Sequence, residues 1–304
     1  MGARTMGVLL VMITASIAAC GPATPVDHTL EDDAITIASF DFDESETIAE
    51  VYAGALRAQG FEVRHLRRVG AREVVLPALE RGLIEIVPEY AGSAVAFLGG
   101  RPSVDPDSSL ATLRVSLGSR DIEVLDPAPA QSRNGLVVTT ETATEHALRT
   151  VSDLRKVASA MTLGGPPECP ERDLCLLGLT QTYGLEFASF LPLDAGGPIT
   201  AAAVQQGTVD VGVLFTSDGS LAEHGLVLLQ DDRRLQPAEN VTPLVRRDAV
   251  ERFGPELTEA IDAVSAELTT TELRSLNALV SSGVAPAVAA ARWLDEHHLG
   301  NASG

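Results

Sequence analysis

The first residues able to do chemistry in this chain are an alternation of aromatic and acidic side chains, Phe40-Asp41-Phe42-Asp43. They follow the short apolar run 35–38, which is typical of a buried strand. Ligand sites in open α/β sheets lie beyond the carboxyl ends of strands, so Asp41 and Asp43 could pair there with a cationic ligand. The alternative is that both aspartates cap the helix expected to begin near Glu44.

Tyr90 is a second candidate, because it follows Pro88-Glu89 where another strand is expected to end. The chain contains only three tyrosines. Tyr52 lies on the apolar face of an expected helix, and Tyr183 precedes a glycine at a helix end, so we interpret both as structural. Tyr90 is therefore the tyrosine that we expect at a binding site.

Cys169 and Cys175 form an isolated pair, six residues apart, in a chain that we expect to be exported. This spacing indicates a disulfide that closes a small loop. A metal site is not favoured, since no histidine lies within 20 residues of the pair. A redox role is not favoured either, because the spacing is not Cys-x-x-Cys.

The chain lacks the common motifs of hydrolases and phosphate-binding enzymes. It contains neither Gly-x-Ser-x-Gly nor His-Glu-x-x-His, and it has no phosphate-cradling glycine loop. Its six histidines are scattered and are interpreted as surface residues. We therefore expect no enzymatic activity, no cofactor and no metal.

The N-terminus carries a different kind of signal. Arg4 precedes a run of apolar and small residues, 6–19, which is typical of a secretory signal peptide and short for a membrane span. Ile17-Ala18-Ala19-Cys20 resembles the bacterial lipobox, in which the cysteine is lipidated. The alternative is an ordinary signal peptide that contains a cysteine. We expect a signal peptide over 1–19, and a lipidated Cys20 with a polar tether over 20–33 that anchors the protein to the outer face of the cell membrane.

The composition limits the partners. The formal net charge is −20, which argues against nucleic acid and against an electrostatic attachment to a membrane surface. Hydrophobic residues make up 45% of the chain, enough for a packed core. These values describe an acidic exported protein.

Strand-like and helix-like segments alternate and must position the candidate residues. The first strand is followed by a helical pattern over 44–59, a strand over 61–66, a helix over 71–81 and a strand over 84–87 that Pro88 is expected to end. This order predicts a mostly parallel sheet covered by helices. A second such unit begins near Gly135, and helical patterns over 248–268, 270–282 and 285–297 complete the chain.

Two crossings are expected between these units, near 126–135 and 216–225. The expected organisation is one lobe formed by 34–128 with 226–304, and a second lobe formed by 129–225. Two α/β lobes joined by two crossovers enclose a cleft that closes around small ligands.

Several segments, in order, resemble the substrate-binding lipoproteins of ABC importers for glycine betaine, choline, carnitine and related osmoprotectants, the ProX/OpuAC-like family. Members carry Pro-Glu-Tyr-Thr-Gly-Thr, and this chain has Pro88-Glu89-Tyr90-Ala91-Gly92-Ser93. Further matches are Val69-Gly70-Ala71-Arg72-Glu73, Gly164-Gly165-Pro166-Pro167-Glu168, Phe215-Thr216-Ser217-Asp218-Gly219 and Leu273-Arg274-Ser275-Leu276-Asn277. The resemblance implies a type II periplasmic-binding-protein fold and delivery of a solute to an ABC permease and its ATPase.

The resemblance also implies roles for individual residues. In this family a box of tyrosines holds a trimethylammonium head by cation–π attraction. Tyr90 matches one of these tyrosines, Ser93 matches a threonine that helps hold a carboxylate tail, and Arg172 matches the tail-binding arginine. The implied ligand-binding set is Phe40, Asp41, Phe42, Tyr90, Ser93, Asn134, Arg172, Phe215, Thr216 and Asp218.

Two departures from the family pattern bear on the ligand. Phe40 stands where many members have lysine, and Asn134 and the segment 236–240 stand where relatives often have tyrosine. Phe42 and Phe215 could replace part of the aromatic box. We therefore expect a cationic or zwitterionic ligand, and one larger than betaine would fit the space that the lost tyrosines leave.

The main functional hypothesis is thus the solute receptor of an ABC importer. The alternatives are an exported α/β hydrolase-like enzyme and a tethered ligand sensor.

Overall fold

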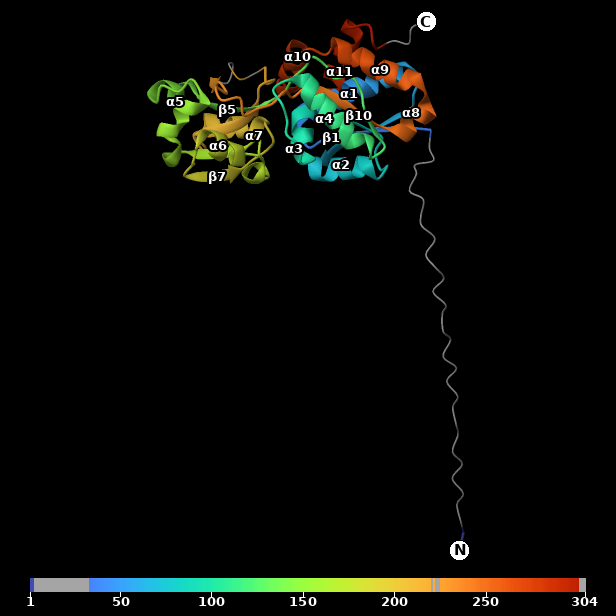
Figure 1. The fold of residues 1–304 in the computed structure, drawn as a ribbon, viewed down its shortest axis with the longest axis horizontal. Coiled ribbons are helices and arrows are strands. Elements are labelled where there is room, and N and C mark those ends of the chain that lie inside the picture. The colour runs from blue at the N-terminus through green and yellow to red at the C-terminus, as the bar shows by residue number, and fades with distance from the viewer. Residues whose placement is uncertain (3–32, 220, 222–224, 301–304) are drawn as a thin grey trace.

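The computed structural model describes residues 1–2, 33–219, 221 and 225–300. The expected lipidation site at Cys20, and almost all of the expected signal peptide and tether, lie outside these ranges. Every helix within them is too short or too polar to cross a membrane. The described chain forms two lobes that lie side by side (Figure 1).

The first lobe is built on a five-stranded mixed sheet with the order β2-β1-β3-β10-β4. β1 pairs in parallel with β2 and β3, whereas β10 runs antiparallel to β3 and β4 because it enters from the other lobe. The strands are β1 (Ile35–Phe40), β2 (Val63–Gly70), β3 (Ile86–Tyr90), β4 (Ile122–Val124) and β10 (Val241–Arg246).

Helices cover both faces of this sheet. α1 buries the apolar face that the sequence predicts, and its Tyr52 hydroxyl lies 3.0 Å from the Ser265 hydroxyl of α9. Figure 1 shows α1 beside α9, α10 and α11, with α2 on the other side of β1. The helices of this lobe are α1 (Asp43–Ala58), α2 (Arg72–Glu80), α3 (Ala91–Phe97), α4 (Pro106–Gly118), α8 (Arg247–Phe253), α9 (Pro255–Glu267), α10 (Thr270–Ser281) and α11 (Pro286–Glu296).

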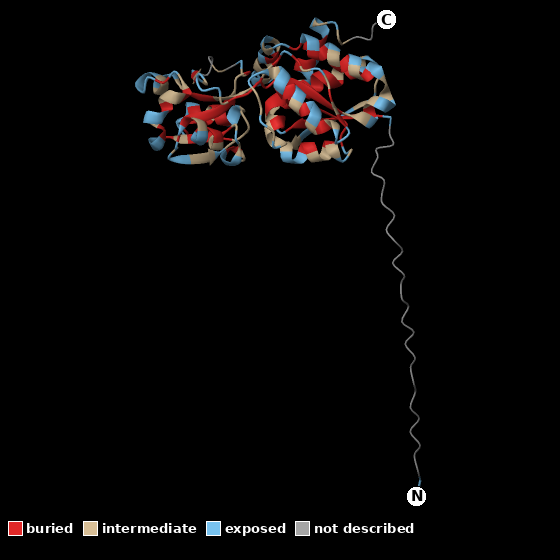
Figure 2. Cartoon of the chain, in the orientation of Figure 1, coloured by how far each residue is buried: buried red, intermediate tan, exposed pale blue. Residues whose placement is uncertain are grey.

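The second lobe has its own five-stranded sheet, with the order β7-β6-β8-β5-β9. Its strands are β5 (Asn134–Thr139), β6 (Thr162–Gly165), β7 (Ser189–Pro192), β8 (Val211–Phe215) and β9 (Leu226–Leu228). Its helices are α5 (Thr140–Glu145), α6 (Leu176–Tyr183) and α7 (Pro198–Gln205), with 3-10 turns η1 (Val151–Lys156), η2 (Ala158–Ala160) and η3 (Cys169–Glu171). Figure 2 shows the buried residues gathered around the two sheets, so each lobe has a separate core.

The return crossing lies later in the chain than expected. β9 pairs with β5 and therefore belongs to the second lobe, whereas the sequence placed residues from 226 onward in the first. The run Leu226–Leu228 is short and apolar, and such a run does not reveal which sheet it will join. The two crossings lie side by side, since Gln131 and Asn240 form an isolated antiparallel bridge.

Pro88 does not end β3, as the sequence suggested, but lies inside it. It stands directly opposite Pro243 of β10. Two facing prolines are compatible with a non-hydrogen-bonded antiparallel pair, in which neither residue donates to the other. On the other side of β3, Ile86 pairs with Ile37 of β1 before Pro88 is reached. Pairing with β10 continues on both sides of Pro88, so β3 extends to Tyr90.

The structure contains the Cys169–Cys175 disulfide that the sequence predicts. Both cysteines are buried in the core of the second lobe. The bond closes a small loop, which carries Arg172 between η3 and α6.

We expect the double substitution Cys169→Ala with Cys175→Ala to lower the free energy of unfolding by about 2 kcal/mol, because so small a loop restricts the unfolded chain only modestly. Urea unfolding followed by circular dichroism measures this. Wild-type protein unfolded in the presence of a reductant should show the same loss. Equal midpoints for the oxidised wild type and the double variant would contradict the prediction.

Candidate ligand-binding site

A cleft of about 840 Å³ lies between the two lobes. The first lobe contributes the ends of β1 and β3 and the start of α2, and the second contributes the disulfide loop, the loop before α7 and the end of β8. Of the residues predicted from sequence, the cleft is lined by Phe40, Asp41, Phe42, Tyr90, Ser93, Asn134, Arg172 and Phe215. Residues from both lobes thus meet at one site.

Three aromatic rings come together in this cleft from both lobes. The ring centroid of Phe42 lies 5.2 Å from that of Phe215 and 6.1 Å from that of Tyr90. Phe40 is buried behind them and stacks on Phe42 at 6.1 Å. Aromatic side chains from both lobes thus pack together along one part of the cleft.

A glycine allows Phe215 to take its place. Gly196 has a φ of +66°, and a Cβ atom there would lie 2.6 Å from carbons of the Phe215 ring. Any other residue would be strained and would displace the ring. The loop before α7 therefore packs against the aromatic group.

Glu44 fixes the orientation of Tyr90 from behind. Its side chain is buried, with 4% exposure, and its Oε1 accepts a hydrogen bond of 2.8 Å from the Tyr90 hydroxyl. Its Oε2 accepts hydrogen bonds from the Ser217 hydroxyl and from Asn277 Nδ2 of α10. Glu44 therefore joins β3, the loop after β8 and α10 at one carboxylate.

Arg72 brings a cation to the cleft at the start of α2. It forms two hydrogen bonds with Glu89, from Nε at 2.5 Å and from Nη2 at 2.9 Å. Its guanidinium also lies 5.3 Å from the centroid of the Phe40 ring. The charge of Arg72 is therefore already paired with a carboxylate of its own lobe.

Glu239 adds a buried carboxylate to the wall of the cleft. It accepts hydrogen bonds from the backbone N–H of Ser93, at 3.0 Å, and from the Ser93 hydroxyl, at 2.7 Å. Burial raises the pKa of Glu239 to about 7, although Ser93 and Arg72 act in the opposite direction. Because the Ser93 hydroxyl donates to Glu239, it has no proton left to donate to a ligand carboxylate.

Asp41 and Asp43 lie at the rim of the cleft and do not cap α1. The N-cap position belongs to Phe42, and among the described residues no side chain caps this end of α1. Arg68 instead forms ion pairs with Asp41 at 3.7 Å and with Asp43. Both aspartates are therefore partly neutralised, but their side chains remain exposed at the cleft.

Arg172 reaches across the cleft. It comes from the disulfide loop of the second lobe, and its Nη2 lies 2.5 Å from Glu73 Oε1 on α2 of the first lobe. A carboxylate ligand that binds Arg172 must therefore compete with Glu73.

Thr216 and Asp218 were expected at the cleft, but neither belongs to its lining as described. The backbone N–H of Thr216 donates to Arg133, and its carbonyl accepts from Arg274 of α10, so it helps hold the two lobes together. The backbone N–H of Asp218 donates to Phe215. Both residues follow a cleft strand, but only the first residue of their motif faces the site.

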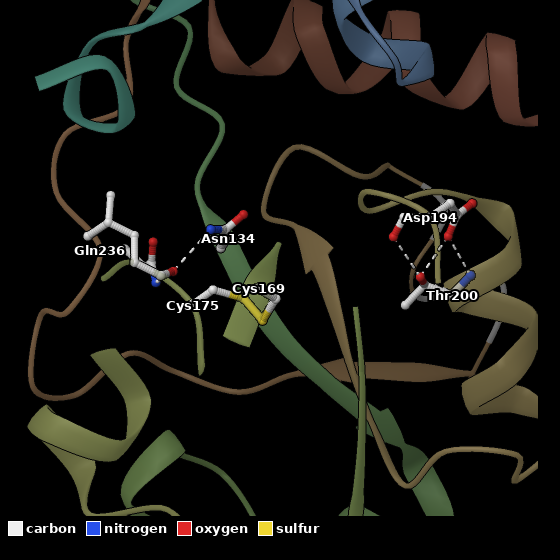
Figure 3. The surroundings of a disulfide bond; sticks show 7 residues. Asn134, Cys169, Cys175, Asp194, Thr200 and Gln236 are labelled. Atoms are coloured by element: carbon white, nitrogen blue, oxygen red, sulfur yellow. Dashed lines mark hydrogen bonds between the residues drawn. A yellow bond between two sulfur atoms is a disulfide. The ribbon is translucent and has the colours of Figure 1, made fainter. Parts of the chain in front are cut away.

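Asn134 lies at the partition between the cleft and a second cavity of about 530 Å³. Asn134 Nδ2 and Gln236 Nε2 both donate to the carbonyl of Leu174, at 3.1 Å and 3.0 Å. Figure 3 shows Asn134 beside the disulfide, with Gln236 nearby and the Asp194–Thr200 contacts at the start of α7. The two polar side chains fill positions where relatives were expected to have tyrosine.

Sequence reasoning missed three charged residues of the site: Glu44, Arg72 and Glu239. Arg72 stood in a matched motif and Glu239 in a segment noted for its missing tyrosines, so both carried a weak signal. Glu44 was counted only as the beginning of a helix. Their pairing with Tyr90, Glu89 and Ser93 depends on the tertiary fold.

Comparison with known proteins decides the family. Residues 33–296 match the OpuAC model, described as the substrate-binding domain of the ABC-type glycine betaine transport system. The chain belongs to this family. The OpuAC family consists of binding proteins rather than enzymes, so the hydrolase alternative is set aside, and this OpuAC domain is the substrate-binding protein of an ABC importer.

Individual relatives are distant but extend over most of the domain. A glycine-betaine-binding protein of Pseudomonas aeruginosa is 27% identical over 271 residues, covering 85% of this chain and 86% of the relative. The carnitine transport binding protein OpuCC of Listeria monocytogenes is 25% identical over 250 residues, covering 81% and 80% of the two chains.

Solved structures confirm the two-lobed fold. A structure described as a glycine betaine/carnitine/choline ABC transporter has a TM-score of 0.70 and 24% identity, covering 88% of this chain and all of the other. Lactococcal OpuAC in its closed form with glycine betaine has a TM-score of 0.63 and 16% identity, covering 88% and 97%. The expected periplasmic-binding-protein fold is therefore confirmed.

We expect Glu239 to make the stability of the unliganded protein depend on pH. Its pKa is about 7 when folded and near the ordinary value of 4.5 when unfolded, so the folded state binds more protons between these values. The stabilisation is complete below pH 4.5 and is lost as the pH rises through 7.

Glu239→Gln should flatten this part of the profile in denaturant unfolding between about pH 5 and pH 8. The control is Glu186→Gln at an exposed position of the second lobe, which should leave the profile unchanged. An identical slope for the wild type and Glu239→Gln would contradict the prediction.

Proposed function

We propose that this protein is a lipid-anchored extracytoplasmic receptor that binds a quaternary-ammonium or related cationic or zwitterionic solute and delivers it to its permease. The observation that carries the ligand class is the group formed by Phe42, Tyr90 and Phe215 in a cleft rimmed by carboxylates. Aromatic faces attract cations, and the attraction grows when water is excluded. Relatives named for binding carnitine and glycine betaine support the same ligand class.

The charges around the cleft favour a cation over a simple anion. Asp41 and Asp43 stand at its rim, and Glu239 stands in its wall. The arginines that line the cleft are Arg68, Arg72 and Arg172, and each is already paired with a carboxylate. An anion would have to break an existing ion pair, whereas a cation would meet carboxylates.

Delivery to the membrane rests on the sequence signals at the N-terminus. The signal peptide over 1–19 would direct export, and a lipidated Cys20 with its tether would hold the domain beside the membrane. An ABC permease and its ATPase would then receive the solute when the lobes open. Several acyl chains hold a protein firmly to a bilayer.

We expect Tyr90→Ala to weaken binding of the tightest ammonium ligand at least tenfold, which corresponds to about 1.4 kcal/mol. The best ligand is found by calorimetry with glycine betaine, choline and carnitine. Tyr90→Phe keeps the ring, so it should retain most of the affinity. The free energy of unfolding should fall by about 1 kcal/mol, because Glu44 loses the hydrogen bond from the Tyr90 hydroxyl. Tyr52→Phe, outside the cleft, should not change affinity. Unchanged affinity in Tyr90→Ala would rule out the aromatic contact.

We expect Arg172→Ala to discriminate between ligands with and without a carboxylate. Glycine betaine should lose at least about tenfold in affinity, because a charge-assisted hydrogen bond is lost, while choline should lose less than about threefold. Parallel titrations of both compounds into the variant and the wild type measure the difference. Equal losses for the two compounds would show that Arg172 does not bind the tail.

A further inference from the structure

Three buried glutamates and one arginine lie at or behind the wall of the cleft. Glu44, Glu89 and Glu239 are 4%, 0% and 2% exposed, and Arg72 is the cation paired with Glu89. Burying a carboxylate is costly unless it receives hydrogen bonds or a counter-charge. Such a cluster favours the entry of a further cation.

The three carboxylates differ in the number of hydrogen bonds that they accept from the protein. Glu44 accepts three hydrogen bonds from protein donors, and Glu89 accepts two from Arg72 and one from the backbone of Tyr90. Ser93 supplies the two hydrogen bonds found for Glu239 among the described residues, one to each oxygen. A carboxylate offers about four acceptor positions, so Glu239 retains acceptor capacity.

Glu239 is also the member of this trio that borders the cleft. It belongs to the residues lining the 840 Å³ cavity, together with Arg72, Ser93 and Tyr90. The other two glutamates are not part of that lining as described. A ligand in the cleft therefore meets the carboxylate that has acceptor positions left.

We propose that Glu239 selects a ligand whose cationic head carries at least one N–H, as in a protonated tertiary, secondary or primary amine, over a fully methylated ammonium. This proposal rests on the proposed function, namely that the cleft binds ammonium-type cations. A protonated amine donates a charge-assisted hydrogen bond to the free acceptor position. A quaternary ammonium has no donor, so it would shield the carboxylate from water without replacing that hydrogen bond.

A positioning role for Glu239 is the competing explanation. By accepting from Ser93, the carboxylate could simply hold the start of α3 in place. A positioning residue would change the affinity of all ammonium ligands by a similar factor. A residue that contacts the head would change the ratio between methylated and less methylated ligands.

The experiment is calorimetric titration of the mature protein with glycine betaine and N,N-dimethylglycine, which differ by one N-methyl group. The assay is run at about pH 8, where Glu239 is mostly ionised. N,N-dimethylglycine should bind at least about tenfold more tightly to the wild type, because a site built to receive a donor rejects the analogue that lacks one. Choline and N,N-dimethylethanolamine repeat the comparison without a carboxylate.

Glu239→Gln should reduce the ratio between the two ligands to within about threefold, since it removes the charge. Ser93→Ala removes one contact to Glu239 but keeps its charge, so the preference for the dimethyl compound should persist. The wild-type ratio tests the proposal even where a variant folds poorly.

Three results would overturn the proposal. The first is glycine betaine binding at least as tightly as N,N-dimethylglycine to the wild type, which leaves the proposed function intact. The second is an unchanged ratio in a folded Glu239→Gln protein. The third is no binding by any of the four compounds, which removes the proposed ligand class and this inference with it.

Discussion

The buried carboxylate of Glu44 is the constraint on which the geometry of the site depends. A carboxylate with 4% exposure must receive donors, and here they come from Tyr90, Ser217 and Asn277. These donors lie on a strand of the first lobe, on a loop of the second and on α10. Satisfying one charge therefore fixes the Tyr90 ring and holds the loop beyond Phe215 against the first lobe. The aromatic group in the cleft follows from this arrangement.

The same requirement produces the opposite result at Glu239. Its protein partners leave it with a pKa of about 7, raised by burial, so the unliganded site holds a carboxylate at some cost to stability near neutral pH. Full pairing, as at Glu89 with Arg72, would make the group more stable and would leave less for a ligand to gain. A carboxylate in the cleft wall that still has free acceptor positions, as Glu239 has, can bind a cationic group.

Local patterns in the sequence predicted the elements that hold the site, and tertiary pairing decided the rest. The apolar run before Phe40 and the helical spacing over 44–59 gave β1 and α1 nearly as observed. Phe42, Tyr90 and Phe215 were predictable because each follows a strand or matches a family motif. The role of Glu239 was not, since its partner Ser93 is 146 positions away. β9 was assigned to the wrong lobe because the sequence of a three-residue apolar strand does not show which strand it will pair with.

The ion pair between Arg172 and Glu73 joins the two lobes, and its arginine is also the residue expected to bind a ligand's carboxylate tail. Each residue belongs to a different lobe, and they lie 2.5 Å apart across the cleft. A carboxylate tail that takes the place of Glu73 gains an arginine but releases an interlobe ion pair. Because both partners are partly exposed, that pair is weak and can be exchanged at little cost. The buried carboxylates behind the aromatic rings have no such freedom, so we expect the proposed receptor to discriminate among ligands by the cationic head more than by the tail.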